Sequence, residues 1–145
     1  MKQHKVLFPF EFGAESMWAD DMGNHRYRLD NVPLFAYGIS YGDEFAARRD
    51  EDRLVFDRVL SRRGAWTYRA TLNEGFSDAA TARDLLEDAK SHASPISQYG
   101  DDHFAFSVDV DDDRKTLESI LDRGARCGFW DWEISSSAEN GVDRK

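Results

Sequence analysis

The alternation of hydrophobic and polar side chains predicts several short strands in the first 65 residues. Near the start, apolar side chains recur at every second position, at Val6, Phe8, Phe10 and Phe12. A period of two places these four side chains on one face of a strand. Pro9 lacks an N–H, so we expect this strand to lie at a sheet edge or to contain a bulge. Further short stretches, at 27–29 and 54–60, predict two hairpins, and therefore short antiparallel strands curled into a partial barrel.

From residue 66 onward, stretches with the apolar spacing of a strand alternate with stretches that have the apolar spacing of a helix. Alternation predicts strands at 66–72, 96–99, 104–110 and 130–134. Helical spacing predicts one helix from an N-cap at Ser77 to about residue 92, and a second from about residue 113 to Gly128. The resulting order, β-α-β-β-α-β, is that of a ferredoxin-like unit over residues 66–135.

The chain shows no proline- or serine-rich linker between its two halves. We therefore expect a single α+β domain over residues 1–135 with one shared core. Its strand-rich half covers residues 5–65 and its ferredoxin-like half covers residues 66–135. Residues 136–145 carry no apolar period, which predicts a disordered tail.

Composition and charge limit the cellular compartments in which the protein is expected and the kinds of partner that it could bind. No apolar run approaches the roughly 20 residues that span a bilayer, so we expect no membrane segment. The N-terminus lacks a small-residue cleavage site, which argues against a secretory signal. Cys127 is the only cysteine, which excludes an internal disulfide and suits the cytoplasm. A net charge of −9 disfavours binding to nucleic acid, and residues 101–145 account for −6 of this charge.

Several blocks of the sequence resemble a bacterial family catalogued as domain of unknown function 4265. The resemblance lies in KVLFPFEF, MWADDMGNHRYRLDNVPLFAYGISYGDEF, RLVFDRVLSRRGAWTYR and GFWDWE, and it covers about residues 5–134. The family has no established activity, so the resemblance implies no catalytic residue.

The block YGISYGD is one candidate ligand site. Tyr37, Tyr41 and Asp43 offer hydrogen-bonding groups, and Gly38 and Gly42 would let a backbone approach a ligand. The alternative interpretation is architectural, with the glycines at turns or bulges and the tyrosines packed. The block contains no phosphate-binding GxGxxG or GK[ST] pattern.

An arginine group between residues 48 and 69 is a second candidate. Arg58 and Arg69 lie on predicted strands and Arg62 between them, near Trp66 and Tyr68. Guanidinium groups bind phosphate or carboxylate through paired hydrogen bonds, and an aromatic ring could stack on a base. The alternative is a solvated strand face whose arginines pair with local acids.

A group of aspartates is the third candidate, as a surface for a basic partner. Its members are Asp101, Asp102, Asp109, Asp111 and Asp112. The group lacks the glycine and glutamate spacing of a calcium-binding EF-hand loop, and some members could instead cap the second helix. The four histidines have no metal-ligand spacing. We therefore expect no metal and no cofactor.

The absence of catalytic motifs favours a binding protein over an enzyme, and we assign no catalytic residue. We predict a non-catalytic cytoplasmic protein-binding module of the immunity or antitoxin type, which masks a basic toxin surface with its acidic C-terminal third. The alternative hypothesis is a regulator that binds a small anionic ligand or nucleotide through the N-terminal half. The oligomeric state stays open.

Overall fold

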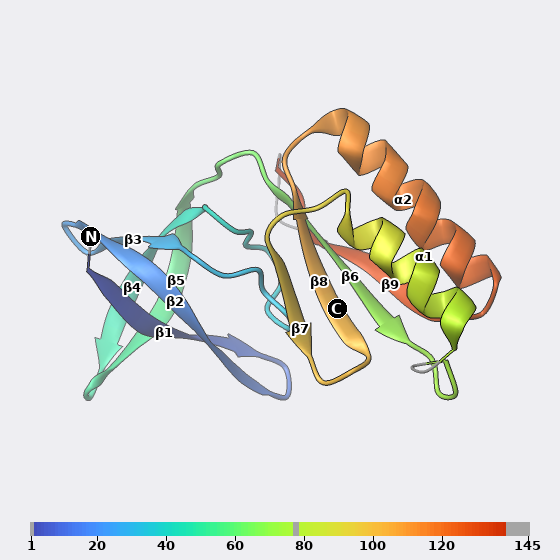
Figure 1. The fold of residues 1–145 in the computed structure, drawn as a ribbon. Helices are drawn as coiled ribbons and strands as arrows, with labels where there is room; N and C mark the ends of the chain where they lie inside the picture. The colour runs from blue at the N-terminus through green and yellow to red at the C-terminus, as the bar shows by residue number, and fades with distance from the viewer. Residues whose placement is uncertain (1, 77–78, 139–145) are drawn as a thin grey trace.

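The computed structural model describes residues 2–76 and 79–138. A five-stranded barrel, a four-stranded sheet and two helices follow one another as three layers, with the helices on the face of the sheet that points away from the barrel (Figure 1). This arrangement confirms the predicted mixed α+β class. No helix in the described part of the chain is both long enough and apolar enough to cross a membrane.

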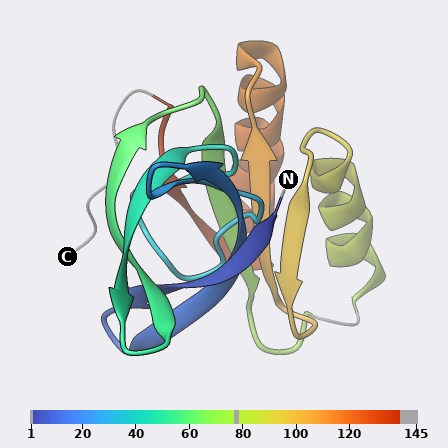
Figure 2. The same ribbon diagram turned by 90° about the vertical axis from the view of Figure 1, so that its left-hand side faces the viewer.

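The N-terminal strands form a closed barrel, whereas we had expected a partial one (Figure 2). Its strands are β1 (Gln3–Phe10), β2 (Gly13–Gly23), β3 (Arg26–Leu29), β4 (Glu44–Asp50) and β5 (Arg53–Ser61). Neighbours in sequence pair antiparallel, and a short parallel contact of β1 with β5, Val6 to Leu54 and Leu7 to Val55, closes the ring. Pro9 lies beyond that contact, so its missing N–H interrupts no pairing with β5.

The second half contains β6 (Trp66–Leu72), α1 (Ala80–Lys90), β7 (Ile96–Tyr99), β8 (His103–Val108), α2 (Asp111–Arg126) and β9 (Trp130–Ser136). Its sheet has the order β7-β8-β6-β9, and all three pairings are antiparallel. The predicted N-cap Ser77 lies outside the described residues, and so does the predicted tail from residue 139 onward. Residue 136 belongs to β9, so the strand continues one residue past the predicted domain end.

The two faces of the sheet have different chemistry because side chains alternate along each strand. Tyr68, Ala70 and Leu72 of β6 pack under the helices. The helix layer lies close to the sheet at Gly124, where an added Cβ would come within 2.1 Å of the Trp130 ring. The opposite face carries polar groups, among them Thr67, Arg69 and Thr71 of β6.

The buried apolar residues form two clusters, so the expectation of one shared core is wrong. One cluster fills the barrel around Val6, Phe8 and Phe45, and the other lies between the sheet and the helices. The layer between the barrel and the sheet is polar. It is built by residues 30–43, which leave β3, run to the sheet and return to β4 (Figure 1).

Candidate functional site

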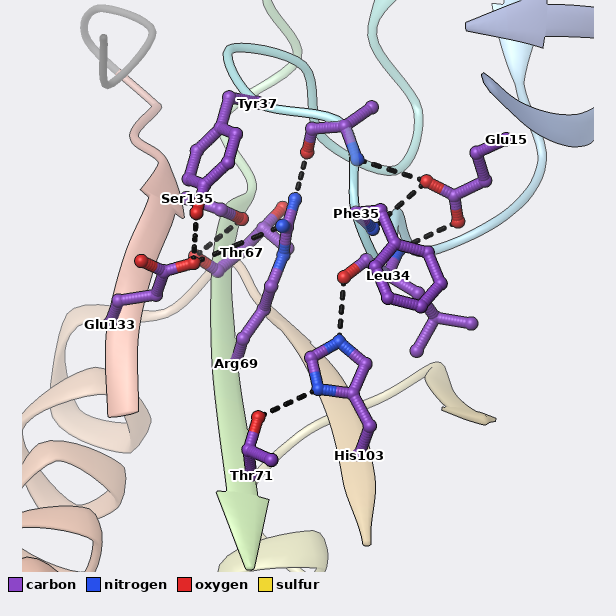
Figure 3. Close-up of polar contacts among 11 residues, drawn as sticks. Glu15, Leu34, Phe35, Tyr37, Thr67, Arg69, Thr71, His103, Glu133 and Ser135 are labelled. Atoms are coloured by element: carbon purple, nitrogen blue, oxygen red, sulfur yellow. Dashed lines mark hydrogen bonds and ion pairs between the residues drawn. The ribbon is translucent and has the colours of Figure 1, made fainter. Parts of the chain in front are cut away.

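The loop of residues 30–43 is held by the barrel on one side and by the sheet on the other (Figure 3). The Glu15 carboxylate of β2 accepts hydrogen bonds from three consecutive backbone N–H groups, those of Leu34, Phe35 and Ala36, at 2.7, 3.0 and 3.0 Å. On the sheet side, the Gly38 N–H donates to the Ser135 carbonyl at 3.0 Å. Gly38 has a φ of +80°, a conformation that glycine adopts readily.

Arg69 of β6 is the charged centre of this layer. Its side chain is only 4% exposed, and it donates a hydrogen bond to the Ala36 carbonyl of the loop. The guanidinium carbon lies 4.6 Å from the centroid of the Tyr37 ring and its Nη1 lies 3.9 Å from the Glu133 carboxylate. Burial lowers the pKa of Arg69, and the negative charge of Glu133 opposes that shift. The Tyr37 hydroxyl also donates to Glu133, at 2.7 Å, so loop and sheet share one polar network.

His103 of β8 fixes the other end of the loop. Its Nε2 lies 2.7 Å from the Leu34 carbonyl, and its Nδ1 lies 2.8 Å from the Thr71 hydroxyl. Because a carbonyl only accepts hydrogen bonds, the geometry requires a proton on Nε2. In the neutral ring Nδ1 then accepts from Thr71, so both ring nitrogens are bonded and the imidazole is held in one orientation.

Aromatic rings line the space beside this network. Phe35 stacks on His103 with ring centroids 5.0 Å apart and on Phe10 at 5.5 Å. The ring of Tyr99, at the end of β7, meets Phe35 edge-on at 5.4 Å. These rings come from the barrel, the loop and two strands of the sheet, so all three parts of the fold contribute to one aromatic wall.

A groove of about 440 Å³ opens between this wall and the tip of the β1–β2 hairpin. Phe10, Phe12, Phe35, Tyr37, Arg69, His103 and Glu133 line it, together with Pro9, Glu11 and Leu34. A second depression, of about 310 Å³, shares Arg69, His103 and Glu133 and extends along the sheet to Asp131 and Trp132. We call the two together the aromatic groove.

The groove has exposed aromatic residues beside it and carboxylates along it. Phe12 at the hairpin tip is 88% exposed, and Tyr99 is 63% exposed. Glu11, Asp131 and Glu133 belong to the lining, which holds one fixed cation, the buried Arg69. This combination of aromatic surface and excess negative charge suits an apolar or cationic group better than an anion.

The structure places only one residue of the predicted YGISYGD site in the groove. Tyr37 lines it, whereas Tyr41 is half-buried and lines neither depression. Asp43 is 1% exposed and accepts hydrogen bonds from the backbone N–H groups of Ser40 and Arg63, both at 2.9 Å. Burial raises the Asp43 pKa, and these two hydrogen bonds oppose the rise. Asp43 therefore shapes the turn into β4 and does not face the groove.

The three predicted arginines do not converge on a common site. Arg58 is exposed and pairs with its neighbour Asp57 at 2.8 Å. Arg62 donates to the Gly38 carbonyl at 3.0 Å and lies 3.6 Å from Asp43. Only Arg69 reaches the groove, and there it already contacts Ala36 and Glu133.

The predicted acidic group is divided between the two ends of β8. Asp101 and Asp102 lie in the turn before His103, next to the groove, while Asp109, Asp111 and Asp112 lie at the other end of the strand. Six residues of strand separate the two sets by about 20 Å. All five are exposed. Within residues 2–76 and 79–138, no cluster of three or more potential metal ligands is present.

Sequence reasoning missed the aromatic residues of the groove. Phe12 was assigned to the apolar face of a strand over residues 6–12, but β1 ends at Phe10 and residues 11 and 12 form the turn. Gly13 directly after Phe12 is the signal that could have placed that turn. Phe35, Tyr99 and His103 are far from Phe12 in sequence, and no local pattern brings them together.

A comparison with solved structures supports the same fold in another protein. The chain matches a crystal structure described as that of a hypothetical protein from Neisseria gonorrhoeae, with a TM-score of 0.77 and 18% sequence identity. The match covers 93% of this chain and 95% of that one. At this identity it shows a shared fold and nothing about activity. No curated protein matches the sequence.

The family comparison covers most of the chain. Residues 15–132 match the family described as "Domain of unknown function (DUF4265)". That range includes the loop of residues 30–43, Arg69, His103 and most of the groove lining, and it begins just after the hairpin tip. The chain therefore belongs to the DUF4265 family.

Proposed function

We propose that the protein is a non-catalytic protein-binding module that receives an exposed segment of a partner in the aromatic groove. The observation that carries this proposal is the pair of exposed aromatic side chains, Phe12 and Tyr99, beside a groove with aromatic walls. Large exposed aromatic side chains grouped around a pocket are typical of interfaces, because they gain most from being covered.

The charge around the groove supports a basic partner. Glu11, Asp131 and Glu133 belong to the lining, and Asp101 and Asp102 lie on the adjoining turn. Lysine or arginine side chains next to an apolar anchor would meet these carboxylates at the edge of the groove. Such pairs mainly speed association and set specificity, so the complex should weaken as salt rises.

An immunity or antitoxin role is the form of this function that we favour. A small acidic protein that covers a basic surface of a toxin needs an interface of this kind, and residues 101–145 contribute His103, Asp131 and Glu133 to it. In this proposal the protein acts in the cytoplasm, where the single exposed Cys127 would stay reduced. We also propose that residues 66–135 form a ferredoxin-like unit, which the strand order β7-β8-β6-β9 supports.

Affinity capture from the native cell with the tagged full chain tests the proposal. We expect the double variant Phe12→Ser/Tyr99→Ser to lose a partner that the wild type retains. The matched control is Leu60→Ser/Val110→Ser, which removes two exposed apolar side chains outside the groove. Equal capture by both double variants would contradict the proposal.

Charge is tested in the same way. Asp101→Asn/Asp102→Asn and Asp111→Asn/Asp112→Asn each remove two exposed carboxylates, from opposite ends of β8. If the partner binds over the groove, the first pair should weaken capture more than the second, and the difference should shrink at high salt.

The alternative is binding of a small anionic ligand through the N-terminal half. The three arginines predicted for it do not form a common anion site. Arg58, Arg62 and Arg69 each lie within 4.0 Å of a carboxylate of this chain, and Arg62 and Arg69 also donate to carbonyls of the loop. A different set of cations, Lys5, Arg49 and Arg53, lines a single depression on the barrel.

A further inference from the structure

A basic depression of about 350 Å³ lies on the barrel where β1 meets β5. His4 and Lys5 of β1, Ser16 of β2, Arg49 of β4 and Arg53 of β5 line it, and Asp52 is the one carboxylate that the described residues contribute to its lining. It shares no residue with the aromatic groove. The groove lies at the Phe10 end of β1 and this depression at the His4 end, and these two residues are about 20 Å apart along the strand.

The strand register explains why the cations meet there. Parallel pairing of Val6 with Leu54 puts Lys5 and Arg53, the preceding residues, at the same level of adjacent strands. Antiparallel pairing of Arg49 with Leu54 brings Arg49 to that level as well, but on the opposite face of the sheet from Arg53, because paired residues share a face and Leu54 packs into the barrel. Arg49 nevertheless lines the depression, so three cations from three strands border it, although Lys5 and Arg49 stand 44 positions apart in the sequence.

These cations differ from most other arginines of the barrel strands in how their charge is balanced, with Arg48 of β4 as the exception. Arg26, Arg28 and Arg58 each pair with a carboxylate. Among residues 2–76 and 79–138, no carboxylate lies within 4.0 Å of the cationic nitrogens of Lys5, Arg49 or Arg53, although Lys5 lies 4.7 Å from the centroid of the Trp18 ring. The lining thus holds three fixed positive charges against one negative charge, in a chain whose net charge is −9.

We propose that this depression binds the phosphate group of a small molecule or free phosphate. A phosphate group at neutral pH carries about 1.5 to 2 negative charges, and the lining has the excess positive charge to match them. Two guanidinium groups offer paired N–H donors, the Lys5 ammonium adds a mobile point charge, and the Ser16 hydroxyl is a further donor. The volume accommodates a phosphate with a small organic body against the side chains of Leu7 and Leu54.

The test is a titration of the ¹⁵N-labelled full chain with inorganic phosphate and with phenyl phosphate, followed by NMR at low salt. We expect saturable shifts of the amide signals of His4, Lys5, Ser16, Arg49 and Arg53. Arg53→Gln should weaken binding about tenfold, the usual effect of losing one charged hydrogen-bonding partner. The matched control Arg58→Gln removes an equal charge from the same strand, at a position paired with Asp57, and should change affinity less than twofold.

Two results would overturn the proposal. One is the absence of saturation with both probes, and the other is an equal loss of affinity in Arg53→Gln and Arg58→Gln, which would show that only the overall charge matters. Tighter binding of phenyl phosphate than of phosphate would assign the site to phosphate esters, and equal affinity would assign it to the free ion. Phe12→Ser/Tyr99→Ser should bind both probes like the wild type, so the outcome is independent of the aromatic groove.

Discussion

At the scale of single residues, Arg69 connects parts of the molecule that have separate cores. It belongs to β6, yet it donates to the loop carbonyl of Ala36 and lies under the ring of Tyr37. A buried guanidinium is expensive to desolvate, and here Glu133, the carbonyl and the aromatic face offset that cost together. Its Nε is buried without a hydrogen-bond partner in the described part of the chain, so the compensation is incomplete.

Replacement of Arg69 by methionine should therefore destabilise the protein strongly. The variant keeps an apolar stem but leaves the Ala36 carbonyl and the Glu133 carboxylate without their cation, and we expect a loss of about 3 kcal/mol in the free energy of unfolding. Arg58→Met removes the same charge at an exposed position and should change it by less than about 0.5 kcal/mol. Urea unfolding of both variants measures the difference. Similar values for the two would show that Arg69 does not hold the loop.

At the scale of secondary structure, charged pairs on neighbouring strands stabilise the barrel. Glu44 begins β4 opposite Arg28 of β3, and its carboxylate accepts a hydrogen bond from Arg26. This bond, with smaller contributions from the charges of Arg26, Arg63 and Arg28, lowers the Glu44 pKa below its ordinary value of 4.5. A carboxyl whose pKa is lower in the folded state stabilises the fold above the unfolded pKa. It loses that contribution as the pH falls through the folded pKa.

Glu44→Gln should consequently destabilise the protein in a pH-dependent way. At pH 7 we expect the variant to be less stable by about 1 kcal/mol, because the pair is partly exposed and screened by solvent. The difference should begin to shrink near pH 4.5 and disappear once the folded carboxyl is protonated. Urea unfolding at a series of pH values, with the exposed Glu74→Gln as control, measures this. A difference that stays constant down to low pH would exclude the charge as its cause.

An element could be predicted from the sequence where a local pattern determines it, and was missed where it depends on contacts between residues far apart in the chain. Strands β6, β8 and β9 were predicted because each has one face under the helices, which leaves a clear alternation in the sequence. The barrel closure was missed because it depends on two residue pairs, Val6 with Leu54 and Leu7 with Val55, that no local pattern encodes. The same reason hid the groove, since Phe12, Phe35 and Tyr99 meet only in the folded chain. Tyr37 and Arg69 were predicted as members of two separate sites, and the structure brings them into contact with each other and with Ala36 and Glu133, which the sequence did not indicate.

At the scale of the whole molecule, the loop of residues 30–43 connects the barrel, with its own core, to the sheet and helices, which share the other core. Ala36 and Ile39 pack into the barrel cluster, while the Ser40 hydroxyl shares a buried 2.7 Å hydrogen bond with Thr67 of the sheet. A layer of this kind contributes less hydrophobic energy than a continuous core, so the coupling of the two halves depends on hydrogen bonds to a few side chains and on the ring contacts of Phe35.

This coupling gives a prediction about cooperative unfolding. Trp18 is the only tryptophan of the barrel, and the other three belong to the second half of the chain. A Trp18→Phe protein therefore reports on the sheet by fluorescence. A triple variant that retains Trp18 and has phenylalanine at positions 66, 130 and 132 reports on the barrel. We expect each reporter to give the same urea midpoint as its own far-UV circular dichroism, because the loop ties the barrel and the sheet into one cooperative unit.

Adding Ser40→Ala and Thr67→Ala together should separate the fluorescence midpoint from the circular dichroism midpoint, since the variant removes a buried bond between the halves without touching either core. Ser91→Ala with Thr116→Ala, which removes two hydroxyl hydrogen bonds within the helical layer, is the control and should leave the transitions coincident. Transitions that already differ without the Ser40 and Thr67 changes would mean that residues 1–135 behave as two domains.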